Sequence, residues 1–298
     1  MWNFVNDMID KSKIFIILSY IFVIYISLLA LIFIFQRSLM YFPLKEKISK
    51  SFYKNTQLKI IDISTSDGLI LKSLYKKSET NINKTILVFH GNAGHIGHRV
   101  SKFKPFMDKG YGLLLLEYRG YGENKGKPTK LGLYRDGEAA INYLINQKIK
   151  SKNIIVYGES LGTAIATKLS TNYSFNMTIL EAPFTSVADV AQKRYWIFAA
   201  KYLVLDNFDN LGIIEKIKSP LLLLHGYKDY VINIAFGKKV FESAPKPKEA
   251  LFVQNAGHNN LFEFNLVNKI LNILKKYWYL LFKFFIYFKF FLVKYYNI

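Results

Sequence analysis

The sequence contains no cysteine among its 298 residues. Disulfide bonds, thiolate nucleophiles and cysteine-based zinc sites are therefore excluded, although this absence does not identify a cellular compartment. Acidic residues are also scarce, because 21 Asp and Glu stand against 41 Lys and Arg, which gives a net charge of +20. The basic residues are scattered and no aromatic-basic nucleic-acid motif accompanies them. We therefore expect solvated basic faces and no nucleic-acid partner.

Charge is absent altogether from residues 14–35, which follow an N-terminal tail of residues 1–13. As a helix this run would be ~33 Å long, enough to cross the hydrocarbon core of a bilayer. The alternatives are a cleaved signal peptide, whose apolar region is shorter and ends in a small-residue cleavage site, and a buried helix, which is seldom apolar on every face. We predict an uncleaved membrane anchor. The count of flanking basic residues weakly favours a cytoplasmic catalytic domain but leaves the sidedness open. These residues are Lys11 and Lys13 before the run and Arg37, Lys45, Lys47 and Lys50 after it.

Short apolar runs alternate with helical patterns along the rest of the chain. Residues 57–65 and 69–76 read as two antiparallel strands joined by an Asp67-Gly68 turn. Continuous apolar runs of the buried parallel type follow at 85–89, 112–116, 154–157, 177–180, 221–224 and 250–253. Helical patterns are predicted at 96–109, 131–149, 161–171, 234–243 and 259–275. This alternation predicts an α/β fold with a mostly parallel, doubly wound sheet.

The expected organisation has four further parts. Residues 36–55 are read as a linker and residues 56–275 as the α/β domain. Within that domain, residues 186–216 interrupt the alternation and are aromatic and helical, so we predict an inserted cap over the carboxyl edge of the sheet. The tail 276–298 is dense in Phe, Tyr and Lys. That composition suits a membrane interface, but an extension without function explains it equally well.

The central motif is Gly158-Glu159-Ser160-Leu161-Gly162, which has the form G-x-S-x-G. It lies between an apolar strand and a helical run, which is the context of a nucleophile elbow. Small residues are needed at both ends because a strained strand-to-helix turn brings backbone segments very close together. Ser160 is therefore the candidate nucleophile, although the motif alone also occurs in ordinary turns.

A glycine-rich loop, His90-Gly91-Asn92-Ala93-Gly94, follows the strand at 85–89. Such a loop can present a backbone N–H that pairs with the N–H of Leu161 to form an oxyanion hole. We place the loop donor at Asn92, with Ala93 as the neighbouring possibility. A metal site at His90, His95 and His98 is the competing interpretation, but no carboxylate cluster accompanies these residues. We expect no metal and no cofactor, and expect His90 to brace the loop.

An acid and a base are found after Ser160 in the chain. Asp229 follows the apolar run 221–224 and His258 follows the run 250–253, so both lie where catalytic groups gather at the carboxyl edge of a parallel sheet. The order Ser, Asp, His is the order found in hydrolases of this architecture. We predict a Ser160–His258–Asp229 triad, with Glu181 as a rival acid at another strand end.

Six segments together resemble the α/β-hydrolase superfamily. They are 90–94, 118–122, 158–162, 181–186, 225–229 and 257–258. The sequence is most similar to the N-terminally membrane-anchored Bem-type branch, which is related to serine aminopeptidase-like hydrolases and to protein depalmitoylating thioesterases. The resemblance spans about residues 14–275 and implies an eight-stranded hydrolase sheet and the triad. The sequence departs from the family pattern at Glu117, Asn124 and His95, none of which belongs to the triad.

These features predict a single-pass, membrane-anchored serine hydrolase that cleaves an ester, thioester or lipid-like acyl substrate. A peptidase acting on N-terminal residues is a second possibility, since the family is broad in substrate. The third is a membrane-tethered scaffold that keeps the fold without activity, which would require a disabled triad. A long apolar cavity between the cap and Ser160 would favour acyl substrates, and a short acidic one would favour amines.

Overall fold

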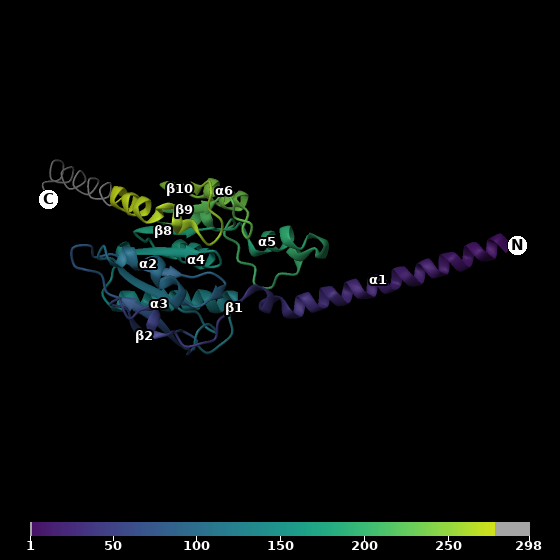
Figure 1. Cartoon of the computed structure of the whole chain (residues 1–298), viewed down its shortest axis with the longest axis horizontal. Helices are drawn as coiled ribbons and strands as arrows, with labels where there is room; N and C mark the ends of the chain where they lie inside the picture. The colour runs from purple at the N-terminus through teal and green to yellow at the C-terminus, as the bar shows by residue number, and fades with distance from the viewer. Residues whose placement is uncertain (1, 278–298) are drawn as a thin grey trace, which may run out of the picture.

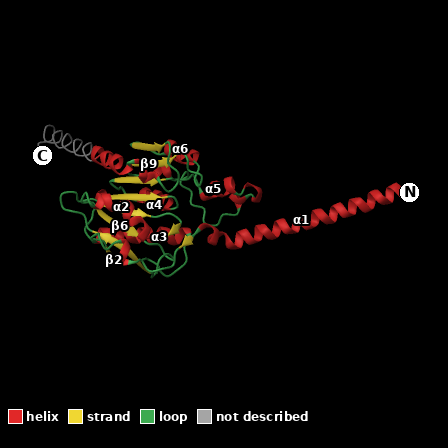
Figure 2. Cartoon of the chain, in the orientation of Figure 1, coloured by secondary structure: helices red, strands yellow, loops and turns green. Residues whose placement is uncertain are grey.

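A computed structural model describes residues 2–277 of the chain and shows an eight-stranded, mostly parallel sheet between helices (Figures 1 and 2). The spatial order of its strands is β10-β9-β8-β7-β4-β6-β3-β2. Their bounds are β2 Lys59–Ser64, β3 Ile70–Lys76, β4 Thr85–Phe89, β6 Gly112–Leu116, β7 Ile154–Glu159, β8 Met177–Glu181, β9 Leu221–Gly226 and β10 Lys248–Val253. The α/β-hydrolase architecture expected from the sequence is confirmed.

The hairpin β2–β3 forms where the Asp67-Gly68 signal lies. Gly68 has φ of +85°, a left-handed conformation that glycine adopts without a steric penalty. β3 also pairs antiparallel with β6, whereas every other neighbouring pair in this sheet is parallel. The parallel strands therefore end at one common edge, to which the site residues are attached.

Helices cover both faces of the sheet and divide the core in two. Successive residues of β4 point to opposite faces, so that Leu87 and Phe89 pack in one core while Ile86 and Val88 pack in the other. The first core is covered by α3 (Lys130–Asn146), α4 (Gly162–Asn172) and α6 (Ile234–Ser243). The second is covered by α2 (Val100–Met107) and by a C-terminal helix that begins at residue 266.

The segment expected as a cap, 186–216, leaves the sheet after β8 and returns before β9. It contains α5 (Val187–Arg194) and three short 3₁₀ helices, η4 (Trp196–Phe198), η5 (Ala200–Tyr202) and η6 (Ile214–Lys216). Its two ends are held together by a bridge between Ser186 and Asp209. Asn207 fixes the start of α5 by accepting a hydrogen bond from the Ala188 N–H.

The N-terminal helix α1 (Trp2–Met40) projects from the domain, with α5 beside its base (Figure 1). It continues beyond Phe35, and its span Lys11–Met40 is long and apolar enough to cross a membrane. The stretch 36–55, expected as a linker, holds the last turn of α1, β1 (Phe42–Pro43) and η1 (Lys50–Phe52). β1 pairs in parallel with β5 (Ala93–Gly94). The tail 276–298 lies outside the described residues from residue 278 onward.

Candidate active site

Ser160 lies on a tight turn between β7 and α4. Its φ is +51°, in the left-handed region that is costly for a residue with a side chain. A Cβ at Gly158 would come within 2.5 Å of the Gly162 carbonyl oxygen, and one at Gly162 within 1.9 Å of the Phe89 carbonyl oxygen. Both distances are far below contact, so this turn requires glycine at both positions. The backbone N–H of Ser160 donates to the Glu181 carbonyl, which ties the turn to β8.

The structure brings Ser160, His258 and Asp229 together from three separate loops. His258 Nε2 lies 3.2 Å from Ser160 Oγ, and His258 Nδ1 lies 2.7 Å from Asp229 Oδ2. These are hydrogen-bond distances along an unbroken chain from carboxylate to imidazole to hydroxyl. The hydroxyl is thus placed next to a base, and the base is oriented by an acid.

Asp229 is buried and its carboxylate is fully engaged. Oδ1 accepts hydrogen bonds from the N–H groups of Val231 and Ile232, at 2.9 and 2.8 Å. His225 Nε2 lies 3.3 Å from Oδ2 and also 2.9 Å from the Ile232 carbonyl oxygen. Burial would raise the pKa of the Asp229 carboxyl, but the hydrogen bonds from His225 and His258 outweigh burial and hold that pKa below its usual range. Asp229 therefore remains an anion beside the imidazole.

The loop 90–94 lies against the elbow, and the end of α1 holds it there. Asn92 Nδ2 donates to the Met40 carbonyl, while the Asn92 carbonyl accepts from the Phe42 N–H, each at 2.9 Å. The Tyr121 hydroxyl donates to that same carbonyl at 2.8 Å. Asn92 and Leu161 both line the cavity that contains Ser160. The two residues expected to supply the oxyanion donors therefore lie at the same cavity as Ser160.

The loop 90–94 is supported by His90 and by the three residues that depart from the family pattern, Glu117, Asn124 and His95. His90 is fully buried, with Nδ1 2.7 Å from the Gly91 oxygen and Nε2 3.1 Å from Glu117 Oε1. Glu117 Oε2 accepts from the Ile96 N–H, and Asn124 Nδ2 donates to the Glu117 carbonyl, both at 3.0 Å. His95 Nδ1 accepts from the Gly97 N–H and begins the helical turn η2 (Ile96–Arg99). The described residues contain no group of three or more His, Asp or Glu side chains placed to hold a metal ion.

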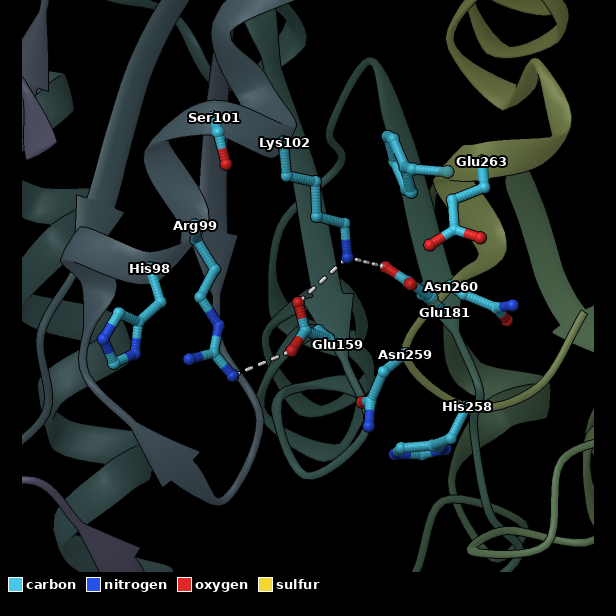
Figure 3. A pocket seen from close by; sticks show the side chains of 11 residues that line it. His98, Arg99, Ser101, Lys102, Glu159, Glu181, His258, Asn259, Asn260 and Glu263 are labelled. Atoms are coloured by element: carbon cyan, nitrogen blue, oxygen red, sulfur yellow. Dashed lines mark hydrogen bonds and ion pairs between the residues drawn. The ribbon is translucent and has the colours of Figure 1, made fainter.

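A polar hollow of about 490 Å³ lies on one side of His258 (Figure 3). Lys102 donates to Glu159 at 2.9 Å and is also bonded to Glu181, while Arg99 donates to Glu159 at 3.0 Å. Burial would lower the pKa of Lys102, but the two carboxylates outweigh it and raise that pKa above its usual value. Burial would likewise raise the pKa of Glu159, but Lys102 and Arg99 lower it below its usual range. The four charges neutralise one another.

This network also places the rival acid. Glu181 is bonded to Lys102 and to the Tyr157 hydroxyl, so its carboxylate is engaged away from the imidazole, which meets Asp229 instead. Arg99 and Lys102 were not expected to be near the site, since the lysines were interpreted as solvated. The sequence signal that could have indicated a nearby cation is Glu159, the second residue of G-x-S-x-G. An acid beside Ser160 at a sheet edge needs a cation partner.

A second, apolar cavity of about 380 Å³ opens on the Ser160 side. Its walls come from the last turns of α1, from α5 and from the segment 198–204 of the cap. Ser160, Leu161 and Asn92 also line it. Among the described residues that line it, Arg194 is the one charged side chain. The cavity thus offers mainly apolar contacts beside Ser160.

Comparisons with known proteins identify the family of the chain. Residues 80–207 match the family model described as serine aminopeptidase, S33. Human alpha/beta hydrolase domain-containing protein 17B is 35% identical over 202 residues, covering 66% of this chain and 68% of the relative. The chain belongs to the α/β-hydrolase superfamily, and its mostly parallel sheet with flanking helices is the fold of that superfamily.

One further sequence relative and one solved structure are also similar to this chain. An uncharacterised protein of Mycobacterium tuberculosis is 30% identical over 227 residues, covering 76% of this chain and 81% of the relative. Among solved structures, an esterase of Pyrococcus furiosus superposes with a TM-score of 0.64 at 20% identity, covering 80% of this chain and 97% of the esterase. At that identity the likeness concerns the fold.

Proposed function

We propose that this chain is a membrane-anchored serine hydrolase that cleaves carboxylic esters or thioesters with an apolar acyl group. The observation that carries the proposal is the continuous hydrogen-bonded line from Asp229 through His258 to Ser160 at the inner end of an apolar cavity. A hydrolase family and esterase-like fold are consistent with it.

The proposed reaction begins when His258 Nε2 takes the Ser160 hydroxyl proton and Ser160 Oγ attacks the substrate carbonyl carbon. The backbone N–H groups of Asn92 and Leu161 stabilise the resulting oxyanion. His258, held in orientation by Asp229, then gives its proton to the leaving oxygen or sulfur. Water then enters, loses a proton to His258 and attacks the acyl carbon; the bond to Ser160 Oγ breaks, His258 returns the proton to Oγ, and the acid is released.

The polar hollow lined by His258 and the apolar cavity lined by Ser160 support a division of the substrate. The acyl chain fits the apolar cavity, because that cavity contains Ser160. The leaving group must lie near His258 Nε2 to receive its proton, and His258 also lines the polar hollow. A substrate with an apolar acyl part and a polar leaving part matches this arrangement.

The aminopeptidase alternative is less well supported. A free α-amino group needs a carboxylate near the nucleophile, and the described residues lining the cavity at Ser160 supply Arg194 as their charged group. In the neighbouring hollow, Glu159 and Glu181 are already paired with Arg99 and Lys102. An inactive scaffold is also disfavoured, since a chain without activity has no need to keep the triad in hydrogen-bonding register.

The contacts of α1 support an uncleaved anchor. Arg37 pairs with Asp206 at 2.9 Å, Gln36 donates to the Leu203 carbonyl at 3.1 Å, and Tyr25 donates to the Ile197 carbonyl at 2.8 Å. Removal of this helix as a signal peptide would strip one wall from the cavity. It would also leave the buried Asp206 carboxylate without its cation.

Labelling by a fluorophosphonate probe tests the proposed function directly. We expect the full-length protein in detergent or bilayer to be labelled and Ser160→Ala to be unlabelled, with hydrolysis of p-nitrophenyl acyl esters reduced by roughly 10⁴-fold or more. Ser186→Ala, a serine at the start of the cap, is the matched control and should keep its label. Full labelling of Ser160→Ala, or faster cleavage of aminoacyl anilides than of acyl esters, would contradict the proposal.

A further inference from the structure

One side of α1 is covered by the cap along much of its apolar length. The half-buried positions Tyr25, Leu29, Ile32, Gln36 and Met40 recur at intervals of three and four residues, which places them on a single face. The Tyr25 ring stacks on Phe198 with centroids 6.1 Å apart, and its hydroxyl bonds to Ile197. The cap therefore extends along α1 from Met40 as far as Tyr25.

That contact fixes where the cap lies relative to a bilayer. Asp10, Lys11 and Lys13 limit the apolar run at its N-terminal end. A hydrocarbon core of about 30 Å that starts after Lys13 needs roughly 20 residues and so reaches about residue 33. Tyr25 is then about 12 Å inside the nearer boundary of that core, at a rise of ~1.5 Å per residue. Whatever touches Tyr25 lies at the same depth.

The surface of the cap at that depth is suited to lipid. Trp196 is 71% exposed, Ile197 57% and Tyr202 85%, although all three are large and at least partly apolar. Side chains of this kind are covered by acyl chains or by headgroups at a membrane interface. Lys193 and Lys201, also exposed, can extend their ammonium groups toward phosphate. Because this surface is continuous with the spanning helix, its partner is the bilayer itself.

The apolar cavity extends toward the same region. Its inner end is at Ser160, and its α1 wall includes Ile32 and Phe33, which fall within the run that spans the hydrocarbon. Its opposite wall includes Tyr195 and Phe198 of the cap tip. An acyl chain lying in the leaflet thus faces a path of apolar side chains that leads to the nucleophile.

We propose that the cap tip, residues 195–203, is immersed in one membrane leaflet beside α1, and that the acyl chain of the substrate enters the cavity sideways from that leaflet. The proposal rests on the proposed function, because it takes α1 as an uncleaved anchor and Ser160 as the nucleophile. It adds that the substrate is a membrane-resident acyl compound, captured without passing through water.

The absence of cysteine allows a direct test of depth, since each single-cysteine variant then carries one label. We would attach a fluorophore to Trp196→Cys in full-length protein reconstituted in phosphatidylcholine–phosphatidylglycerol vesicles, with quenchers on the lipid acyl chains. Lys152→Cys, which is exposed just before β7 at the opposite edge of the sheet, is the matched control. We expect strong quenching of the label at 196 and at most slight quenching at 152. Equal quenching at the two positions would overturn the proposal.

A third label separates this inference from the anchor on which it rests. Phe22→Cys lies within the apolar run of α1 and should be quenched whenever the helix is in the bilayer. Quenching at 22 without quenching at 196 would reject immersion of the cap while leaving the anchor intact. No quenching at 22 would reject the anchor, and the inference with it.

Entry from the leaflet is tested by Trp196→Asp, which replaces an exposed cap residue by a charge. We expect hydrolysis of a long-chain ester presented in vesicles to fall by ~10-fold or more, because a carboxylate resists the hydrocarbon layer. Hydrolysis of water-soluble p-nitrophenyl acetate and fluorophosphonate labelling should be unchanged, which shows that the variant is folded. An equal loss with both esters, or no loss with either, would contradict lateral entry. If the unmodified protein cleaves neither ester, the proposed function fails, while the quenching result still reports on the cap.

Discussion

The polar hollow beside His258 and the apolar cavity beside Ser160 have similar sizes but opposite chemistry. In the polar one, Lys102 and Arg99 are matched by Glu159 and Glu181, so each ion has a partner within the protein. In the apolar one, most of the side chains that line the walls are apolar, and Ser160 is among the lining residues. Charge at this sheet edge therefore ties Glu159 of the elbow to Arg99 and Lys102, whereas the cavity beside Ser160 is largely free of charge.

The sharpest contrast is expected between Asp229, which contacts His258, and Glu181, which lines the polar hollow. Asp229→Asn should reduce kcat by about 10⁴-fold, because an amide stabilises the wrong imidazole tautomer and cannot stabilise the imidazolium. Glu181→Gln, the matched change in the polar hollow, should keep kcat within about tenfold of the unmodified enzyme, since this carboxylate contacts Lys102 and Tyr157. Steady-state hydrolysis of a p-nitrophenyl ester measures both. The reverse order would make Glu181 the catalytic acid.

A second substitution removes the cation from the polar hollow. Lys102→Met leaves the buried Glu181 without its cation and the half-buried Glu159 with Arg99 alone, and should lower the free energy of unfolding by about 3–5 kcal/mol. Lys104→Met, two residues along α2, breaks an exposed pair with Asp108 and should cost less than about 1 kcal/mol. Denaturant unfolding in matched detergent measures both. Equal losses would show that the network is no more than a surface feature.

A third substitution narrows the apolar cavity. Val190→Trp places a larger side chain on the α5 wall and should lower kcat/KM for a long-chain ester by about 10–100-fold relative to the acetate ester. Lys193→Trp, on the same helix but exposed and outside the cavity lining, should leave that ratio unchanged. An unchanged ratio for Val190→Trp would mean that the acyl group binds elsewhere.

The weakest of these effects is a pH dependence of the free energy of unfolding, which arises from Glu159 in the polar hollow. The pKa of Glu159 is lower in the folded protein than its ordinary value of 4.5, so its ionised form stabilises the fold above that pH. This contribution is lost as the pH falls below about 4.5 toward the folded pKa. The difference in unfolding free energy between the unmodified protein and Glu159→Gln should therefore be constant from pH 7 to 5 and shrink toward pH 3. A difference that grows in acid would contradict the assigned ion pairs.

Much of the fold could be predicted from sequence because its signals are local. Each parallel strand is a short apolar run, and the hairpin glycine and the elbow glycines occur where the backbone leaves no alternative. The placement of Asp229 and His258 followed from a simple rule, since both come directly after such runs and parallel strands end at one edge.

The contacts of α1 could not be predicted in the same way. Residues 14–35 are apolar on every side, so nothing in their pattern distinguishes the face at Tyr25 and Ile32 that the cap covers from the faces that it leaves open. The pairing of β1 with β5 involves two residues on each side, too short for a periodic signal. Lys102 was missed because burial of a lysine depends on carboxylates that are distant in sequence.

The hydrogen bonds made by Tyr25 and Gln36 give α1 a fixed rotational register. These residues are 11 positions apart, close to three full turns, so both side chains face the cap at once. Inserting one residue between them would rotate one end by ~100° against the other, and the two bonds could not form together. The Asn92 loop, bonded to the last carbonyl of this helix, would receive the displacement. Helices of equal length and hydrophobicity are therefore not interchangeable with α1, and chimeras that exchange this helix must preserve its phase.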